Sequence, residues 1–458
     1  MSNLGTPDRP LRVAIVGSGP SGFYAAEGLF KTFFNSEVDM YERLPTPYGL
    51  VRGGVAPDHF KIKGVMKIYE KIAADPRFFF WGNIEIGRDL SVSDLGQFYD
   101  AIIFACGAEA DQRLNIPGED LPGSHTATEF VGWYNGHPDF KNRVFNLSPR
   151  RAVIIGQGNV AVDVARILAK TVNELKNTDI AEHALKNLEK SLVDEIYLIG
   201  RRGPVQAAFT RQEIKELGEL EDCDPIINPD ELRLNPESQA ELLDPDNERK
   251  KNYSILEEFS KRLKSSKRKK LYVQFKRSPV GIEGAGRVER VIFEKNELTG
   301  EAGKQKARGT GKKETLPCGL FFRSVGYRGV SLPGVPFDSQ KGIFPNIQGR
   351  IVSEGKPILG LYAAGWIKRG PSGVIGTNKP DSYETVDCLL KDIQDLKPCS
   401  LPQRSAVQNF LRTRGLKWVT FSDWNRIDLA EIERGKIRNK LREKFTSVDE
   451  MLKVIGKN

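Results

Sequence analysis

The sequence predicts an α/β fold in which parallel strands alternate with helices, and three observations lead to this expectation. Residues 13–29 read VAIVGSGPSGFYAAEGL, an apolar strand that runs into glycines and then into a helix. Residues 152–168 read AVIIGQGNVAVDVARIL and repeat the same order. The chain of 458 residues also exceeds the length that one hydrophobic core usually supports. Strand, glycine turn and helix are typical of dinucleotide-binding βαβ units, so two Rossmann-like domains are expected.

The first turn is expected to hold the phosphates of a dinucleotide. Residues 11–16 should form a strand, Gly17 the tight turn, Gly19 the place where a pyrophosphate approaches the backbone, and Gly22 the helix–strand contact. The free N–H groups and dipole of a helix start favour an anion there. The next strand should end at Glu42, 20 residues after Gly22, where a carboxylate accepts hydrogen bonds from a ribose. An ordinary surface turn explains the glycines but not this whole order.

The second turn begins with Gly156 and Gly158 and has Ala161 at the third position, which the looser form of the pattern allows. The strand after it ends not in an acid but in Arg201 and Arg202. Two guanidiniums suit a ribose 2′-phosphate, because arginine binds phosphate in a bidentate manner. This predicts NADPH rather than NADH; the alternative is a solvated arginine pair on a loop.

The five cysteines show no C-x-x-C or metal-ligand spacing, so no metal site is expected. Disulfide reductases need a redox-active cysteine pair beside the flavin, and iron–sulfur subunits need runs of cysteine ligands. Two nucleotide turns suggest a resident flavin and an exchangeable hydride donor. The electrons should then leave the flavin for an acceptor outside this chain.

Composition narrows the class of protein further. Hydrophobic content of 39% is ordinary for a folded protein, and no apolar run approaches the roughly 20 residues of a membrane span. The formal net charge of +9 favours an acidic partner. The first residues contain no targeting pattern, so we expect the cytoplasm for a bacterial source, or the mitochondrial matrix if a transit peptide has been removed.

Five segments carry a resemblance that runs from one end of the chain to the other. They are YERLPTPYGLVRGGVAPDH at 41–59, IIGQGNVAVDVARIL at 154–168, GRRGPVQAAFTRQEIKEL at 200–217, GWIKRGPSGVIGTNKPDS at 365–382 and TFSDWNRID at 420–428. With them the chain resembles the adrenodoxin reductase-type ferredoxin–NADP reductases, which are glutathione-reductase-like flavoproteins. The resemblance implies FAD and NADP(H) as cofactors, an acidic [2Fe–2S] ferredoxin as partner, no nucleic acid partner, and a monomer.

The resemblance also implies which residues bind each cofactor. Trp366, for which a core aromatic is the alternative, lies in a glycine-rich loop whose helix start can stabilise charge on the reduced flavin. For FAD the residues are Gly17, Gly19, Pro20, Ser21, Gly22, Glu42, Leu50, Trp366, Gly373, Val374 and Ile375. For NADP(H) they are Gly156, Gln157, Gly158, Asn159, Val160, Arg201, Arg202, Glu213 and again Gly373.

By the same resemblance, His59 and Asp163 should approach each other between the domains, as a proton relay or an interdomain latch. A structural histidine is an equal alternative, because hydride transfer to flavin needs no protein acid or base.

Ferredoxin binding is expected at basic residues of the inserted domain. The resemblance implies Lys215, and Arg249, Lys250 and Lys251 add positive charge, as does the basic run 261–270. Solvated surface charge is the alternative for any single one of them.

The expected organisation places one domain inside the other. Residues 1–108 and 334–458 would form the FAD domain, and residues 109–333 the inserted NADP domain. Within the insert, we expect a surface excursion with helical pieces at 228–266 and a mobile hairpin tip or loop at 301–315.

The expected function is a ferredoxin–NADP reductase that passes hydride from NADPH to FAD and then single electrons to the ferredoxin. The enzymatic alternatives are an NADPH-dependent flavin monooxygenase, for which no F-x-G-x-x-x-H-x-x-x-W stretch is present, and a diaphorase with another acceptor. A basic nucleotide-binding protein without turnover is the non-enzymatic alternative.

Overall fold

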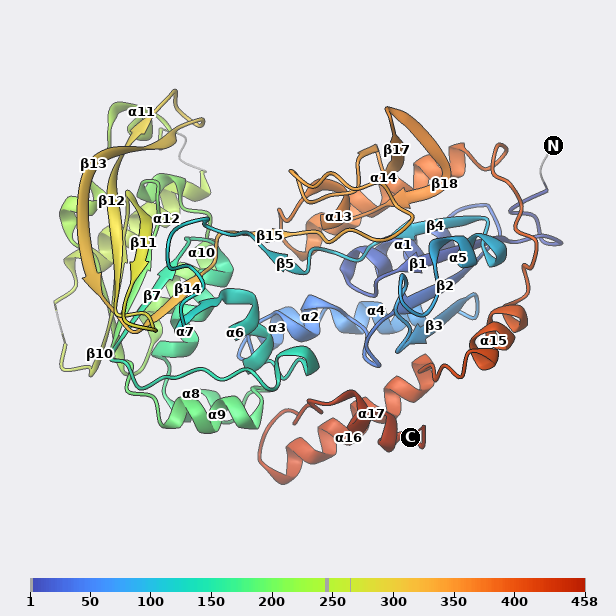
Figure 1. Cartoon of the computed structure of the whole chain (residues 1–458), viewed down its shortest axis with the longest axis horizontal. Coiled ribbons are helices and arrows are strands. Elements are labelled where there is room, and N and C mark those ends of the chain that lie inside the picture. The colour runs from blue at the N-terminus through green and yellow to red at the C-terminus, as the bar shows by residue number, and fades with distance from the viewer. Residues whose placement is uncertain (1–2, 244–246, 264, 458) are drawn as a thin grey trace.

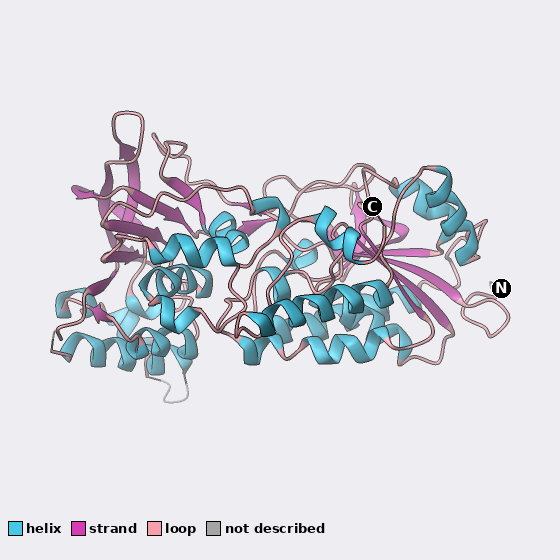
Figure 2. Cartoon of the chain, turned by 90° about the horizontal axis from the view of Figure 1, so that it is seen from below, coloured by secondary structure: helices cyan, strands magenta, loops and turns pink. Residues whose placement is uncertain are grey.

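The computed structural model describes residues 3–243, 247–263 and 265–457. It is an elongated molecule with two lobes (Figure 1). Seen from below, the strands gather in two separate groups, one toward each end of the long axis (Figure 2). This agrees with two domains that each have a sheet and a core.

The first lobe is built on a seven-stranded sheet in the order β16-β17-β18-β4-β1-β2-β3. Strands β18, β4, β1, β2 and β3 are parallel, and β16 and β17 are an antiparallel extension. The strands are β1 Leu11–Val16, β2 Ser36–Glu42, β3 Phe78–Gly82, β4 Ala101–Phe104, β16 Asn346–Ile347, β17 Arg350–Ser353 and β18 Lys356–Ala363. Every residue of β1 is buried, as a strand in the centre of a parallel sheet requires.

The second lobe contains a six-stranded, all-parallel sheet in the order β6-β14-β7-β8-β10-β9. Its strands are β6 Ser124–Thr126, β7 Arg151–Ile155, β8 Glu195–Ile199, β9 Cys223–Ile226, β10 Lys269–Gln274 and β14 Leu320–Arg323. The strand predicted at 11–16 is β1 of the first sheet, directly before Gly17, and the strand predicted before Arg201 is β8 of the second sheet. The α/β class with one domain inserted into the other is confirmed.

Two short strands join the lobes. The chain leaves the first sheet after β4 and returns to it at β16, and between these points β5 Ala110–Asp111 pairs in antiparallel fashion with β15 Tyr327–Arg328. Both strands lie between the lobes in Figure 1. The outgoing and returning connections therefore lie side by side.

A three-stranded antiparallel sheet covers part of the second lobe. It consists of β11 Arg277–Glu283, β12 Arg290–Thr299 and β13 Lys306–Pro317. The expected loop at 301–315 is therefore wrong for most of its length, although the hairpin is correct. Its residues are basic and mostly exposed, so they lack an alternating apolar pattern, and pairing with β12 makes this segment a strand.

Helices surround the sheets of both lobes, and several of them, such as α1, α4, α5 and α14, pack directly on strands. In the first lobe these are α1 Pro20–Phe30, α2 Leu50–Gly53, α3 Phe60–Lys63, α4 Met66–Ala73, α5 Val92–Phe98, α13 Trp366–Arg369, α14 Asn378–Lys391, α15 Arg404–Thr413, α16 Phe421–Ile437 and α17 Val448–Val454. In the second they are α6 Ala127–Tyr134, α7 Asn159–Ala169, α8 Val172–Leu175, α9 Glu182–Glu189, α10 Arg211–Glu216, α11 Pro236–Ala240 and α12 Glu248–Lys261. The last two confirm helical pieces within 228–266. Lys264, in the basic run 261–270, lies outside the described residues.

Candidate active site

The first glycine turn has the geometry of a phosphate site. Gly17 has φ of +107°, and a Cβ there would lie 2.5 Å from the Ala105 carbonyl oxygen. A Cβ on Gly22 would lie 2.2 Å from the Gly17 oxygen, whereas a Cβ on Gly19 would meet nothing within 4 Å. Gly17 and Gly22 are therefore required by the fold, while Gly19 leaves open space beside the helix start.

The second turn repeats this arrangement. Gly156 has φ of +131°, and a Cβ there would lie 2.1 Å from the Ser324 oxygen, whereas a Cβ on Gly158 would meet nothing within 4 Å. The Gln157 side chain donates to the Gln274 carbonyl at 2.9 Å, and Asn159 Oδ1 accepts from the Thr210 N–H at 2.8 Å. The turn is thus tied to its neighbours and still open on one side.

Both turns present helix starts without side-chain caps. Gly19 is the N-cap of α1 and Gly158 the N-cap of α7, and neither helix has a side-chain hydrogen bond at its cap. In contrast, Ser91, Thr126 and Thr420 cap α5, α6 and α16 with full capping boxes. Free N–H groups beside open space fit a dinucleotide pyrophosphate at each turn.

Glu42 lies where a ribose ligand of the first nucleotide is expected. Its carboxylate accepts hydrogen bonds from Ser18 Oγ at 2.6 Å and from the Leu44 N–H at 3.1 Å. Burial raises the pKa of Glu42, and the Ser18 hydrogen bond opposes this. Leu50, 41% exposed, begins α2 beside the turn, where the Tyr48 N–H donates to the Ser18 carbonyl.

The loop between β18 and α14 lies against the first turn. A Cβ on Gly365 would lie 2.1 Å from Ser21 Oγ, and Ser21 Oγ donates to Asn378 Oδ1 at 3.0 Å. Trp366 is half-buried rather than a core residue, and its ring lies 5.4 Å from that of Tyr327 in β15. Gly373 and Val374 are exposed, and the helical turn begins at Ile375. The structure therefore brings both halves of the predicted flavin set together.

Arg201 and Arg202 follow β8 and are exposed. Within the described part of the chain, neither guanidinium has a hydrogen bond or an ion pair. Burial and the charges of Arg201 and Arg249 lower the pKa of Arg202. Two unpaired guanidiniums, with a third nearby, form a site that favours an anion.

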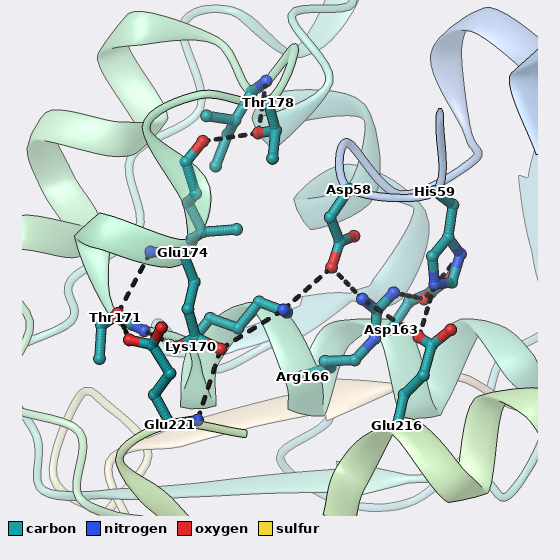
Figure 3. A network of polar contacts seen from close by, with 12 residues as sticks. Asp58, His59, Asp163, Arg166, Lys170, Thr171, Glu174, Thr178, Glu216 and Glu221 are labelled. Atoms are coloured by element: carbon teal, nitrogen blue, oxygen red, sulfur yellow. Dashed lines mark hydrogen bonds and ion pairs between the residues drawn. The ribbon is translucent and has the colours of Figure 1, made fainter. Parts of the chain in front are cut away.

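His59 and Asp163 face each other between the two lobes, as a long ion pair rather than a hydrogen bond (Figure 3). His59 Nδ1 lies 3.9 Å from Asp163 and 3.8 Å from Glu213, while His59 Nε2 forms a 2.7 Å hydrogen bond with Glu216. Three carboxylates of the second lobe thus surround one imidazole of the first. Glu213, expected at the NADP ribose, faces this imidazole, and its Oε2 is buried with no partner among the described residues.

Burial and neighbouring charges shift the pKa values of the groups in this cluster. Burial alone would lower the pKa of His59, but Glu216, Asp163 and Glu213 raise it above its ordinary value. Burial would raise the pKa of Glu216, yet His59 and Arg166 lower it to about 2. Burial, reinforced by Asp163, raises the pKa of Glu213 to about 7. Glu216 is therefore ionised near neutral pH and favours the charged form of His59, whereas Glu213 is partly protonated there.

Sequence reasoning did not identify Glu216, Arg166 or Asp58. Buried Arg166 binds Asp163 at 2.5 Å and lies 3.5 Å from Glu216, and it also pairs with Asp58 of the first lobe. Helical spacing offered the only clue, since Arg166 lies three residues after Asp163, and Glu216 three residues after Glu213.

A second polar contact joins the lobes elsewhere. Lys63 of α3 binds Asp179 at 2.7 Å, and Lys444 of the C-terminal segment lies 3.1 Å from the same carboxylate. All three residues are buried. The second lobe is therefore held by both sequence-distant parts of the first.

The expected ferredoxin-binding residues lie on α10 and α12, two helices that pack together. Lys215 is 68% exposed beside Glu219, Lys250 is exposed, and Lys251 pairs with Glu248. Arg249 pairs with buried Glu241, so part of its charge is already compensated.

All five cysteines are free thiols in the part of the chain described. No helix of that part has the length and apolar character needed to cross a membrane.

Comparisons with known proteins identify the family of the chain. Residues 11–198 match the family model described as pyridine nucleotide-disulphide oxidoreductase. NADPH-ferredoxin reductase FprA from Mycobacterium tuberculosis is 46% identical over 97% of this chain and 99% of its own. The mitochondrial NADPH:adrenodoxin oxidoreductase of Homo sapiens is 41% identical over 99% and 94%. The solved structure of Mycobacterium tuberculosis FprA in complex with NADPH has a TM-score of 0.92 at 45% identity, and covers 98% of this chain and 100% of that one. The chain therefore belongs to the family of NADPH-ferredoxin and NADPH:adrenodoxin oxidoreductases, which are FAD- and NADP(H)-dependent enzymes.

Proposed function

We propose that this protein takes electrons from NADPH and delivers them through FAD, one at a time, to an acidic [2Fe–2S] ferredoxin. The observation that carries the proposal is the presence of two open, uncapped glycine turns in a chain with no disulfide among its described residues. Bound FAD supplies the chemistry that accepts a hydride and releases single electrons. The protein contributes binding, orientation and electrostatics.

We place FAD at the first turn. The α1 N-terminus and Gly19 hold its pyrophosphate, and Glu42 accepts hydrogen bonds from its ribose. Pro20 fixes the first residue of the helix, which leaves the remaining N–H groups free to donate. Trp366 and the loop from Gly373 to Ile375 border the ring. These assignments fit the open face of the turn and the contact between Ser21 and Asn378.

We place NADPH at the second turn. Gly156 to Val160 hold its pyrophosphate, and Arg201 and Arg202 hold its 2′-phosphate. Glu213 has an unused buried oxygen that can accept a hydrogen bond from the coenzyme ribose, and Gly373 borders the nicotinamide. Two guanidiniums that have no partner in the described ranges of the chain support the preference for NADPH over NADH.

His59 and Asp163 act in this proposal as parts of an interdomain latch. Glu216 binds His59 directly, and Arg166 joins Glu216 and Asp163 on one lobe to Asp58 on the other. The latch fixes the distance between the coenzyme sites, on which efficient hydride transfer depends.

The ferredoxin docks on the face formed by Lys215, Arg249, Lys250 and Lys251. These cations on α10 and α12, of which Lys215 and Lys250 are the most accessible, suit an acidic partner and steer its approach. We propose residues 1–108 and 334–458 as the FAD domain and 109–333 as the NADP domain. We also propose a monomer that acts in the bacterial cytoplasm or, for an organellar source, in the mitochondrial matrix.

The test is NADPH-driven reduction of cytochrome c by the purified holoenzyme, with and without a [2Fe–2S] ferredoxin and with NADH as control. Strong dependence on both NADPH and ferredoxin is expected. Rapid flavin reduction by NADPH with no ferredoxin-dependent transfer would leave the coenzyme sites intact but reject the acceptor, and would favour a diaphorase. A stable oxygen adduct of the flavin would favour a monooxygenase instead.

A further inference from the structure

The backbone under the two unpaired arginines is fixed by a segment far away in the sequence. Because the side chains of Arg201 and Arg202 have no partners among the described residues, the direction of their guanidiniums depends on the backbone that carries them. Three consecutive carbonyls of that backbone accept hydrogen bonds from β11 and β12 or the residues beside them. The Gly200 oxygen accepts from the Arg277 N–H at 3.0 Å, and the Arg202 oxygen from the Lys276 N–H at 2.9 Å.

The middle carbonyl, that of Arg201, is held by a side chain. Asn296 of β12 donates from Nδ2 to this oxygen at 2.9 Å, across 95 positions of sequence. The same Nδ2 donates to Ser278 Oγ at 2.8 Å, so both of its protons are used. Only 8% of Asn296 is exposed. A buried amide with both donors engaged has one orientation, and the Arg201 carbonyl is held by it.

An irregularity in β12 orients this amide. The register between β12 and β13 shifts between Glu294 and Asn296, and such bulges redirect side chains. The Asn296 N–H donates to the Lys276 carbonyl at 2.8 Å, and Lys276 has φ of +55°, which non-glycine residues rarely adopt. The backbone hydrogen bonds of Lys276 thus connect Asn296 on one side to the Arg202 carbonyl on the other.

Holding two arginines side by side is unfavourable before an anion arrives. Burial and, after it, the charges of Arg201 and Arg249 disfavour the charged form of Arg202 and lower its pKa. Left free, the two guanidiniums would turn apart, and the coenzyme would have to bring them together at a cost in affinity. A fixed backbone limits that rearrangement in advance.

We propose that Asn296 is a positioning residue for coenzyme selection, which holds the Arg201 carbonyl so that both guanidiniums converge on a 2′-phosphate. The inference rests on the proposed assignment of the arginine pair to that phosphate. Asn296 itself does not touch the coenzyme. Its removal should therefore weaken recognition of the 2′-phosphate without changing the chemistry.

The test is calorimetric binding of 2′,5′-ADP and of AMP to the holoenzyme. Asn296→Ala should weaken 2′,5′-ADP binding about tenfold, because one hydrogen bond between a guanidinium and the 2′-phosphate is misplaced and a bond to a charged group is of this scale. AMP binding should not change. With NADPH as substrate, KM should rise and kcat should stay the same. Asn296→Asp keeps the size but loses both donors, so it should behave like Asn296→Ala and serves if the alanine variant does not fold.

Two controls separate this role from simple stabilisation. Ser278→Ala removes the other acceptor of the same amide and should retain most of the 2′,5′-ADP affinity. Asn187→Ala removes an amide that donates to the Phe145 carbonyl elsewhere in the same lobe, and should change neither ligand. If the wild type binds 2′,5′-ADP and AMP equally, the arginine assignment is wrong. If the wild type discriminates and the Asn296 variants discriminate equally well, the positioning role is rejected.

Discussion

The two glycine turns are followed by strands that end differently. After the first turn, β2 ends in Glu42, whose carboxylate already accepts a hydrogen bond from Ser18. After the second, β8 is followed by Arg201 and Arg202, whose side chains have no partners among the described residues. Both turns begin with a positive-φ glycine and an uncapped helix. The first site completes part of its hydrogen bonding within the protein, as suits a cofactor that stays. The second leaves its charges unpaired, as suits a coenzyme that must be selected on every turnover.

The third position of each turn gives the largest expected difference. Gly22→Ala places a methyl 2.2 Å from a backbone oxygen that cannot move aside, so the α1 start must shift, at a cost of about 1–3 kcal/mol or more. We expect purified Gly22→Ala to lose most of its flavin absorbance and up to about 100-fold in activity, because about 3 kcal/mol, the upper end of that range, corresponds to this factor. Ala161→Gly in the second turn is the matched control and should keep its flavin. A yellow, fully active Gly22→Ala enzyme would contradict the comparison.

Removing one arginine should weaken NADPH binding at the second turn and leave the first turn unaffected. Loss of a charge-assisted hydrogen bond is worth about 1.5–3 kcal/mol, so Arg201→Ala should raise KM for NADPH about 10- to 100-fold. KM for NADH should change by no more than about twofold, the usual scale for a surface substitution. Arg233→Ala, which removes an exposed arginine paired with Asp230 in the same lobe, is the control. Equal effects on both coenzymes would mean that the pair does not bind the 2′-phosphate.

Ferredoxin-dependent turnover should depend on salt, whereas flavin retention should not. We expect the rate to fall about tenfold between low ionic strength and about 0.3 M, because salt screens the attraction between the basic face and the acidic ferredoxin. Lys215→Ala should lower kcat/KM for ferredoxin about threefold at low salt, in line with about 0.7 kcal/mol for an exposed charge. Lys186→Ala is closely matched, since it too is 68% exposed beside a glutamate one turn away. Equal loss in both variants would place the docking face elsewhere.

The smallest expected effect concerns the cluster between the two sites. The folded-state pKa of Glu213, about 7, is raised above its ordinary value, so the protonated form favours folding and this contribution is lost as pH rises through about 7. Glu213→Gln should therefore raise Tm by a few degrees at pH 8 but not at pH 5. The surface variant Glu219→Gln should show no such difference. A Tm gain that is independent of pH would exclude a buried carboxylate as its cause.

Much of the fold and of the coenzyme sites was predictable because the relevant residues are local. Gly17 to Glu42 and Gly156 to Arg202 each form one βαβ unit, whose pattern lies in consecutive residues. Glu216 and Asn296 were not predictable, because each acts on a residue far away in the sequence, His59 and Arg201. The strand at 306–317 escaped notice for a related reason, since pairing rather than apolar alternation creates it.

The paired strands β5 and β15 have a consequence for engineering. Because Ala110 and Arg328 are hydrogen-bonded neighbours, the second lobe begins and ends at adjacent points, and a linker of a few residues can span the gap of about 5 Å. The inserted lobe is thus a cassette that can be excised or exchanged for one with another coenzyme preference. The graft must supply a carboxylate in place of Asp179, or Lys63 and Lys444 would be left as buried amines without their charge partner in the host.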